Sequence, residues 1–467
     1  MATAVNLTSS HRRSLPRRLS RRFMGTLGLV AAASMVVVVS GPGVSGASAA
    51  RASSASKVTI TMWNDPLDAS TTGVPLSKSW LTAGVKLFEA KHRNITVNLI
   101  QEPFAASTAF ETLLHSTEVG GTTPTIGQLY VGGQVIENAK YLVPLNKYLP
   151  KSYIKSLTGW QFVTTGYRAG GKIYAVPYGT GAYYAVYYNK KLMAKAGVKP
   201  PWPTNWTGLI ALGKKIKAKG VQPFEFGEKE GYQGAWTQDG LISGLGGNTG
   251  VLKMFFGKQS LDSALLIKPY KAWNKMYAAG ITNANAPSLS ETQGVADFAA
   301  GTGAMTITGN FENTKFQTGL GKNNVGIFPI PVLRGSKYPK AFSGGPNNAY
   351  VIFKTSKHIR ADLELIKFLT TLRVQVNSIN ALGQIPNNVS FRPTAAFDKQ
   401  QPLLAQVYSY LKKGYKQYEA FDNVMPGSID TYWYKTNNGV FGGTLSPTSA
   451  AASIQTQMQS YLQSSKA

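Results

Sequence analysis

Apolar and polar residues follow two different periods along the chain from residue 58 onward. Val58–Trp63 and Ile95–Ile100 alternate apolar and polar positions, which predicts two strands. Trp80–His92 lies between them and places Leu81 and Val85 on one face of a helix. The succession of strand, helix and strand is typical of an α/β domain.

The same alternation continues to the C-terminus. It predicts a largely parallel sheet with helices on both faces, in which ligands bind beyond the carboxyl ends of the strands. Trp63-Asn64-Asp65 and Gln128–Gly133 occupy that position. Further strands are expected at Ile126–Val131, Val221–Phe226, Ala304–Gly309, Val325–Val332 and Ala349–Phe353, and helices at Phe110–Ser116, Gln134–Leu142, Trp206–Lys219, Trp236–Leu245, Lys268–Ala279, Thr292–Ala300, Arg360–Thr371, Pro402–Phe421 and Pro447–Leu462.

Tyr174–Val198 interrupts this pattern. Pro177-Tyr178-Gly179 separates two short β-rich runs, and Asn189 opens an amphipathic helix. Proline and glycines between two strands suit a hinge better than a packed core. The segment therefore predicts a hinge.

The N-terminus has the pattern of an export signal. Arginines precede the apolar run Met24–Val39, and the small residues Ala47-Ser48-Ala49 follow it. The apolar run is shorter than the ~20 residues that span a membrane, and Arg21-Arg22 resembles a twin-arginine signal. We expect a signal peptide at 1–49 and a flexible mature N-terminus at 50–56. An uncleaved anchor is the alternative.

The composition excludes several classes of function. The chain has no cysteine, which excludes disulfides, thiolate metal sites, thiol catalysis and a lipid-modified cysteine anchor. The four histidines show no metal-ligand spacing, no G-x-S-x-G elbow occurs, and Glu228 and Glu230 are the only clustered carboxylates for glycoside hydrolysis. We therefore expect no enzyme, no cofactor and no metal.

The charge is unusual, with 49 Lys and Arg against 21 Asp and Glu. The basic residues are spread out rather than clustered in nucleic-acid-binding motifs, and the densest run, Lys214–Lys219, suits a solvated helix face. An anionic ligand or cell wall is one alternative. We favour an acidic habitat, in which carboxylates of pKa ~4 contribute little charge. Because few carboxylates need protonating, the fold is expected to survive acid.

Several segments resemble, in the same order, extracellular solute-binding proteins of sugar importers. Tyr174–Val198 resembles their first crossing between lobes. Gly301–Met305 followed by Gly309–Phe311 is similar to their strand before a ligand-contacting aromatic residue, and Gly326–Pro331 to their second crossover. Phe342–Gly345, with Gly344 and Gly345, resembles their return segment. The resemblance implies a two-lobed periplasmic-binding-protein-like fold of type II, with hinge crossovers and a cleft between the lobes.

The same resemblance implies the domains and the partners. Lobe one would comprise 57–178 and 332–357, and lobe two 183–327 and 360–467, with crossings near Gly179–Ala182 and Phe328–Pro331. The protein would be an exported monomer that delivers a sugar to the permease of an ABC importer and binds no nucleic acid. A binding protein for a polyamine, peptide or phosphate ester, or a secreted carbohydrate-active enzyme, is the alternative.

Sugar chemistry and the maltose-binding branch suggest the site residues. A sugar ring stacks its C–H face on aromatic residues and pairs its hydroxyl groups with polar side chains. The sequence departs from that branch at Thr125, where no carboxylate follows Pro124, and at Gly181-Ala182, so the sugar cannot be read from it. The stacking candidates are Tyr232, Trp236, Phe311 and Trp433, and the polar candidates are Asn64, Asp65, Gln128, Glu228, Asn310 and Arg392.

Overall fold

The computed structural model describes residues 56–464 except 65–74, 104–107, 165–169 and 383–384. The chain divides into two units, Met1–Ser54 and Ala55–Ala467, and every described residue belongs to the second. The predicted signal peptide and the candidate Asp65 therefore lie outside the described residues.

The strands form a mixed sheet in the order β2-β1-β3-β7-β4-β5. Its first three strands, β1 (Val58–Asn64), β2 (Ile95–Gln101) and β3 (Ile126–Tyr130), are parallel, as predicted. The prediction of a largely parallel sheet is wrong beyond them, because β7 (Ala341–Ile352) returns antiparallel between β3 and β4. Three short strands complete the sheet: β6 (Val325–Pro329) and β8 (Ile385–Pro386) pair with β4, and β9 (Lys416–Tyr418) pairs with β7.

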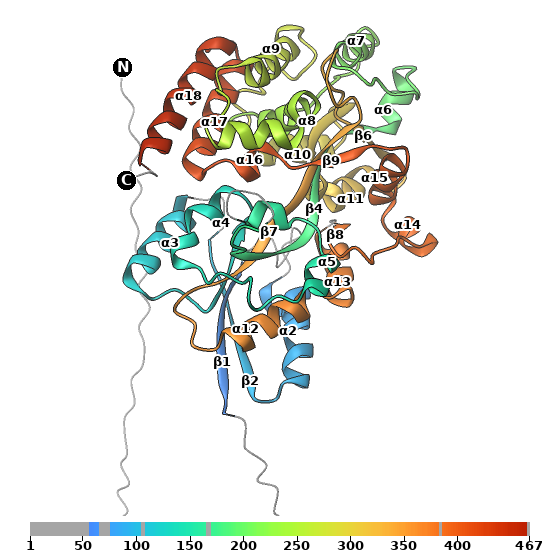
Figure 1. Cartoon of the computed structure of the whole chain (residues 1–467). Helices are drawn as coiled ribbons and strands as arrows, with labels where there is room; N and C mark the ends of the chain where they lie inside the picture. The colour runs from blue at the N-terminus through green and yellow to red at the C-terminus, as the bar shows by residue number, and fades with distance from the viewer. Residues whose placement is uncertain (1–55, 65–74, 104–107, 165–169, 383–384, 465–467) are drawn as a thin grey trace, which may run out of the picture. The chain divides into compact units, whose positions relative to one another are not determined.

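One continuous strand, β4 (Ala175–Asn189), replaces the two strands predicted around Gly179. Its first part pairs with β7, and its last part pairs with β5 (Met305–Gly309) and β6. The predicted break appears as a shift of register between Tyr178 and Gly181. β4 thus runs from one group of strands to the other (Figure 1).

The second crossing lies in β7 rather than at Phe328–Pro331. Ile330 stays beside the second group of elements, where it approaches Gly240. In β7, Gly344 lies opposite Tyr183 of β4, and Asn348 lies opposite Tyr130 of β3. The prediction failed because the proline-rich end of β6 looks like a hinge, although β7 is the strand that pairs with both groups.

A third strand meets β4 at the same place. Ile385 of β8 pairs with Gly181, and Gly181 also pairs with Pro346 of β7. Three segments therefore run side by side where the two groups of elements meet.

The helices around the first group of strands include two that were assigned to lobe two. α12 and α13 pack on α2, so residues 359–382 depart from the predicted 360–467 assignment. No helix is predicted at residues 372–382, where α13 lies. Ser79 caps α2 by accepting a hydrogen bond from the backbone N–H of Thr82 over 3.1 Å. The elements are η1 (Leu76–Lys78), α2 (Trp80–Lys91), α3 (Thr108–Gly120), α4 (Gly133–Glu137), η2 (Ala139–Tyr141), α5 (Lys151–Ser156), η3 (Trp160–Val163), α12 (Ile359–Leu369) and α13 (Leu372–Leu382).

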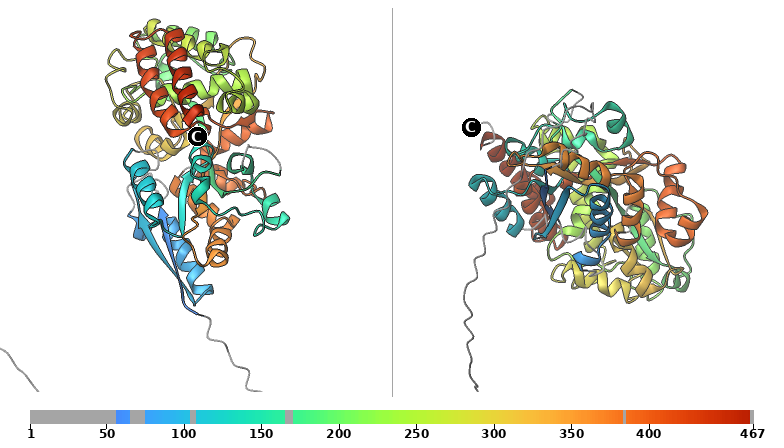
Figure 2. Two further views of the ribbon diagram at one scale, coloured as in Figure 1. Left: turned by 60° about the vertical axis from the view of Figure 1, so that its left-hand side comes forward. Right: turned by 90° about the horizontal axis from the view of Figure 1, so that it is seen from below.

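The remaining helices surround the second group of strands (Figures 1 and 2). They are α6 (Lys190–Lys195), α7 (Trp206–Lys217), α8 (Tyr232–Phe255), α9 (Ala264–Ala278), α10 (Glu291–Ala299), η5 (Asn310–Glu312), α11 (Asn313–Leu320), α14 (Ala395–Gln400), α15 (Pro402–Lys412), α16 (Phe421–Val424), α17 (Gly427–Phe441) and α18 (Pro447–Ser464). Among the described residues, no helix combines the length and apolar character needed to cross a membrane.

Local backbone geometry explains three further departures from the predicted elements. α8 continues past the predicted stop but kinks at Gly247, whose φ is 56°. The helix predicted at Pro402–Phe421 ends at Lys412, just before Gly414, whose φ is 86°. The strand predicted at Val221–Phe226 is reduced to isolated bridges at Phe224.

Both faces of β4 are buried, which ties this strand into two core clusters. Tyr184, Val186 and Tyr188 pack on one face, and Tyr183 and Tyr187 pack on the other. Burying a large side chain contributes roughly 1.5–3 kcal/mol. The aromatic run in β4 therefore holds the strand firmly on both sides.

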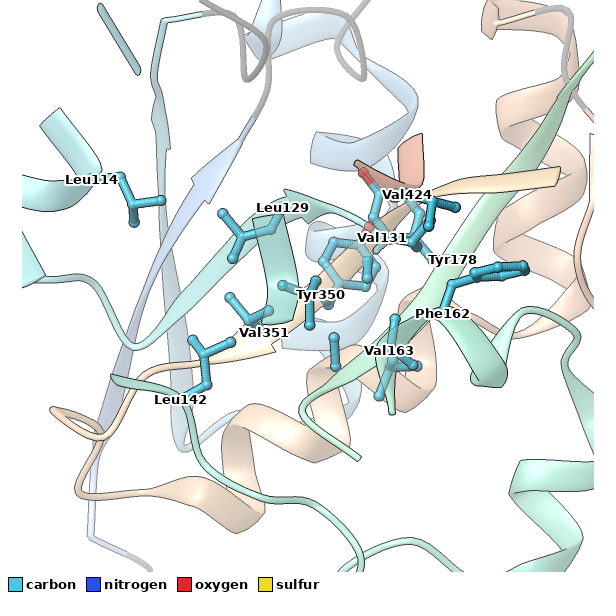
Figure 3. Close-up of a cluster of buried hydrophobic side chains, with 14 of the residues drawn as sticks. Leu114, Leu129, Val131, Leu142, Phe162, Val163, Tyr178, Tyr350, Val351 and Val424 are labelled. Carbon is cyan, nitrogen blue, oxygen red and sulfur yellow. The ribbon is translucent and has the colours of Figure 1, made fainter. Parts of the chain in front are cut away.

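A third core cluster surrounds the other part of β4 and β7 (Figure 3). The rings of Tyr178 on β4 and Tyr350 on β7 stack with their centroids 3.8 Å apart. Val424 of α16 belongs to the same cluster as Val131, which follows β3. A segment from the C-terminal part of the chain thus packs against the first group of strands.

Candidate ligand-binding site

Five aromatic residues from four elements form a chain of contacting rings, here called the aromatic wall: Tyr184 of β4, Tyr232 and Trp236 of α8, Phe311 of η5 and Tyr434 of α17. The indole of Trp236 is central. It stacks on Tyr184 at 5.8 Å and on Tyr232 at 6.2 Å, and it meets Phe311 edge-on at 5.3 Å between ring centroids. Tyr434 completes the wall by meeting Tyr232 edge-on at 5.1 Å.

Helical spacing and a close backbone contact position these rings. Tyr232 and Trp236 are four residues apart, so they share one face of α8. Gly231 precedes α8 with a φ of 82°, and a Cβ there would overlap the carbonyl group of Tyr434. Glycine therefore lets α8 approach α17 closely enough for their rings to meet. All the rings of the wall except that of the buried Tyr184 are half-buried.

Four carboxyl groups lie beside the wall and are here called the carboxyl cluster: Asp239 of α8, Glu419 after β9, Asp422 of α16 and Asp430 of α17. The hydroxyl of Tyr184 donates a hydrogen bond to Asp422 Oδ2 over 3.4 Å, which links the wall to the cluster. Asp239 accepts from the backbone N–H of Phe421 at 2.8 Å. This contact fixes the segment before α16 on α8.

Burial raises the pKa of all four carboxyl groups. For Glu419, burial and the neighbouring Asp422 raise the pKa to about 8, although a hydrogen bond from Asn423 opposes the shift. Asp239 and Asp422 face each other, and a hydrogen bond between them requires one to carry a proton. The cluster therefore holds protons near neutral pH.

Residues at the end of β3 border the same region. Tyr130 lies close enough to Tyr184 to affect its pKa. Gly132 and Gly133 press against the backbone of Asn423–Pro426, where a Cβ on either glycine would overlap main-chain atoms. The predicted position beyond the carboxyl end of a strand, Gln128–Gly133, thus adjoins the cluster.

Some of the predicted site residues come together here. Tyr232, Trp236 and Phe311 belong to the wall. Gly345 lies so close to the carboxyl group of Glu419 that a Cβ there would force this group to move, and Gly344 precedes it in β7 with a φ of 133°.

Trp433 does not belong to the wall, contrary to our expectation. Its side chain has no exposed surface and meets Phe421 edge-on at 4.5 Å in the core. Successive residues of a helix are rotated by about 100°, so Tyr434 takes the position beside Tyr232 while Trp433 turns inward. The expectation of a stacking role for Trp433 is therefore withdrawn.

The other polar candidates make internal contacts, and their roles toward a ligand stay predictions. Arg392 is exposed and donates to carbonyl groups of its own loop, those of Val389 at 2.7 Å and Phe391 at 2.8 Å. The remaining four candidates are buried. Asn64 lies at the end of β1, and Gln128 lies beside Tyr178. Glu228 lies beneath the start of α8 and accepts a hydrogen bond from Gly234 N–H, and Asn310 accepts one from Tyr183 N–H.

Sequence reasoning missed Tyr184, Tyr434 and the whole carboxyl cluster. Helical spacing could have indicated that some of these residues lie together. Trp236 and Asp239 are three residues apart, and Asp430 and Tyr434 are four residues apart, so each pair lies on one face of a helix. The scarcity of acidic residues could also have drawn attention to the carboxyl cluster. Glu419, Asp422 and Asp430 fall within twelve positions of a chain that has only 21 Asp and Glu in all.

Two hollows lie elsewhere on the molecule, and no residue of the wall or of the cluster lines either of them. One, of about 640 Å³, is lined by Lys147, Tyr148 and 357–361. The other, of about 470 Å³, lies around Trp202 and the prolines that flank it. We base the candidate site on its side-chain chemistry and not on the size of a cavity.

Residues 73–376 match the model of the bacterial extracellular solute-binding protein family. The chain belongs to this family. It is 24% identical over 339 residues to an uncharacterized ABC transporter extracellular-binding protein of Pyrococcus horikoshii, which covers 69% of this chain and 73% of the relative. It is 27% identical over 211 residues to a putative binding protein of Brucella abortus, which covers 43% and 47%.

Solved structures similar to this family member share its two-lobed type II fold. A chitin oligosaccharide binding protein has a TM-score of 0.73 at 21% identity, over 87% of this chain and 99% of that chain. The GacH receptor of Streptomyces glaucescens has a TM-score of 0.67 at 20% identity, over 87% and 99%. RafE in complex with raffinose has a TM-score of 0.64 at 20% identity, over 86% and 100%.

Proposed function

We propose that the chain is the substrate-binding component of an ABC importer and captures a sugar or oligosaccharide against the aromatic wall. The observation that carries the proposal is the half-buried indole of Trp236, bordered by the rings of Tyr184, Tyr232 and Phe311. Flat aromatic faces beside buried polar groups match the two surfaces of a sugar ring. The chitin oligosaccharide, acarbose and raffinose named for the similar structures support a carbohydrate ligand.

Capture requires contacts from both lobes. A ligand closes a hinge only if it binds the closed arrangement better than the open one. The wall and the cluster lie on second-lobe elements, whereas Tyr130, Gly132 and Gly133 lie at the end of the first-lobe strand β3. A sugar held between them would favour closure, and the closed protein would present the sugar to a permease. We propose no chemical step.

We propose a division of the lobes that follows the packing. The first lobe holds β1 to β3, α2 to α5, α12, α13 and the adjoining parts of β4 and β7. The second lobe holds the remaining helices with β5, β6, β9 and the last part of β4, which pairs with β5 and β6. The hinge comprises β4, β7 and β8 around Gly181, which pairs with both Pro346 and Ile385.

We also propose export by cleavage of a twin-arginine signal peptide near Ala49, with the mature protein acting outside the cytoplasmic membrane as a monomer. Its partners would be the sugar and the permease, without nucleic acid. The arginine-rich start, the short apolar run and Ala47-Ser48-Ala49 support this proposal. N-terminal sequencing of the exported protein tests it, because retention of the apolar run would indicate an anchor.

A thermal-shift screen of the mature protein tests the function. The panel holds mono- and oligosaccharides, uronates, polyamines, peptides and phosphate esters, each at pH 3 and pH 7. A ligand that binds only the native state raises the melting temperature by mass action. We expect a sugar to raise it. Stabilisation by a peptide, phosphate ester or polyamine alone would move the protein to the alternative class, and turnover of a glycoside would establish an enzyme.

A further inference from the structure

The carboxyl cluster is a concentration of acid in an unusually basic chain. Among the described residues, none of its four groups forms an ion pair. The pKa of each of these groups is affected by other members of the cluster, by Glu137 or by Tyr184. Within the part of the chain that the structure describes, no Lys or Arg is among the neighbours that shift these pKa values.

The titratable groups that face the cluster come from several elements, and those that affect its pKa values are acidic or phenolic. Glu137 of α4 approaches Asp430 from the first lobe. Tyr184 of β4 and Tyr434 of α17 face it from the second lobe. None of these neighbouring titratable groups carries a positive charge.

One carboxyl oxygen in the cluster has no hydrogen-bond partner. Oδ1 of Asp430 lacks a partner, although the residue is only 9% exposed. Asp239 Oδ2 and Asp422 Oδ1 have no partner apart from each other. Buried charges and buried polar atoms are normally paired. A cluster of this kind keeps its protons or receives a cation from outside the chain.

The aromatic wall is suited to the same cation. Ring faces attract ammonium groups, and Trp is the most effective residue in this role. The path from the wall to the cluster is short, because Tyr184 stacks on Trp236 and donates its hydroxyl to Asp422. Asp422 is half-buried as a residue but its Oδ1 is fully buried, so an ammonium group reaches that oxygen only when the surrounding side chains move.

We propose that the ligand is an amino sugar in its cationic form, whose ring lies on the aromatic wall and whose ammonium group binds the carboxyl cluster. The inference rests on the proposed function and narrows its substrate class. An ammonium group has three N–H donors, and Asp239, Asp422 and Asp430 offer the acceptor oxygens described above. The positive net charge of the chain opposes the approach of a cation, so selectivity must arise from these contacts in the bound state.

Binding of an ammonium group should release protons. Burial raises the pKa of these carboxyl groups, that of Asp422 to about 6 and that of Glu419 to about 8, and a nearby positive charge favours their ionised form. Affinity for an amino sugar should therefore rise from pH 5 to pH 7. A neutral sugar should bind with little dependence on pH. Calorimetry in buffers of different ionisation enthalpy measures the protons directly.

The experiment compares, within each set, sugars that differ only in whether each ring carries an amine, an N-acetyl group or a hydroxyl at one carbon atom. The probes are glucosamine, N-acetylglucosamine and glucose, the corresponding galactose set, and the β-1,4-linked trisaccharides of glucosamine, N-acetylglucosamine and glucose. Thermal shift and calorimetry on the mature protein at pH 6 measure their binding. We expect an amine to bind about tenfold or more tightly than its N-acetyl and hydroxyl counterparts, since a charge-assisted hydrogen bond adds about 1.4 kcal/mol.

Variants connect the preference to the cluster. Asp422→Asn and Asp239→Asn should reduce the preference for the amine over its neutral counterparts to about threefold or less. Asp239 is fully buried, so the half-buried Asp422 keeps the test informative if Asp239→Asn fails to fold. Asp262→Asn removes the same charge from an exposed position before α9 and should leave the preference unchanged.

The outcomes separate this inference from the proposed function. Equal binding of amine and neutral members, or tighter binding of a neutral member, overturns the amino-sugar inference and leaves sugar capture standing. Failure of every amine in the panel to bind also overturns it. Binding of the polyamine spermidine with no binding of any sugar overturns both.

Discussion

The hydroxyl of Tyr184 lies 3.4 Å from Oδ2 of Asp422 and donates a hydrogen bond to it. The two residues are 238 positions apart in the chain, yet this contact joins the aromatic wall to the carboxyl cluster. Tyr184 stands on β4, a few residues after Gly181, where the three hinge strands pair. Movement at the hinge would therefore act directly on the part of the site that bears Tyr184.

Trp236→Ala should weaken sugar binding without unfolding the protein. The substitution removes the central ring of the wall, and we expect a loss of roughly 1–3 kcal/mol, about ten- to a hundredfold in affinity. Calorimetry with the best sugar of the screen measures the loss. Trp202→Ala, at another half-buried tryptophan that lines the separate 470 Å³ hollow, is the matched control. Equal affinities of wild type and Trp236→Ala would remove Trp236 from the site.

Trp433→Ala should act on stability instead. The side chain is fully buried against Phe421, and deletion of a buried tryptophan typically costs about 3–5 kcal/mol. Denaturant unfolding should show a lower free energy of unfolding. Folded protein that keeps wild-type stability but binds sugar far more weakly would restore the stacking role that we expected from the sequence.

Gly133→Ala should oppose lobe closure. A Cβ at this position would overlap the backbone of Met425, and relieving such an overlap costs about 1–3 kcal/mol. We expect affinity for the sugar to fall about ten- to a hundredfold, with a larger radius of gyration in solution scattering when ligand is present. Gly120→Ala is the control, because the nearest atom to its Cβ would be Thr122 Oγ1 at 3.6 Å. Unchanged affinity in Gly133→Ala would mean that this contact persists in the open state.

Stability should fall as pH rises from 5 to 8. Burial raises the pKa of Glu419 and Glu118 to about 8, and that of Glu137 to about 7, from an ordinary value of 4.5. A raised pKa means that the native state binds protons more tightly than the unfolded state. The resulting stabilisation is complete below about pH 4.5 and is lost as pH rises through 7 to 8. Glu137 is an exposed residue, so solvent screening reduces its share, whereas Glu118 and Glu419 are buried.

Thermal melts of the ligand-free protein across this pH range provide the measurement. Glu419→Gln should flatten the decline, because glutamine cannot ionise. Asp262→Asn, an exposed substitution, should leave the slope unchanged. A melting temperature that increases from pH 5 to pH 8 would contradict the prediction.

The sequence alone was enough to predict the class of fold and most of its elements. β1, α2, β2 and β3 follow their apolar periods closely because their packing partners are local and their patterns are strong. Family segments such as Gly301–Met305 added the two-lobed architecture. The composition also led us to expect a protein that survives acid. The structure supplies a further reason, since burial raises the pKa of several of its few carboxyl groups.

Only the tertiary structure decided where the chain crosses between lobes and which residues share the site. Gly181 and Pro177 look like a break in the sequence, but backbone pairing with β7 carries β4 through them as one strand. Trp433 and Tyr434 are adjacent in the sequence, but one helical step turns Trp433 into the core and leaves Tyr434 at the wall. Likewise, Tyr184 and Asp422 meet only because separate elements fold together, and local sequence patterns carry no information about such distant contacts.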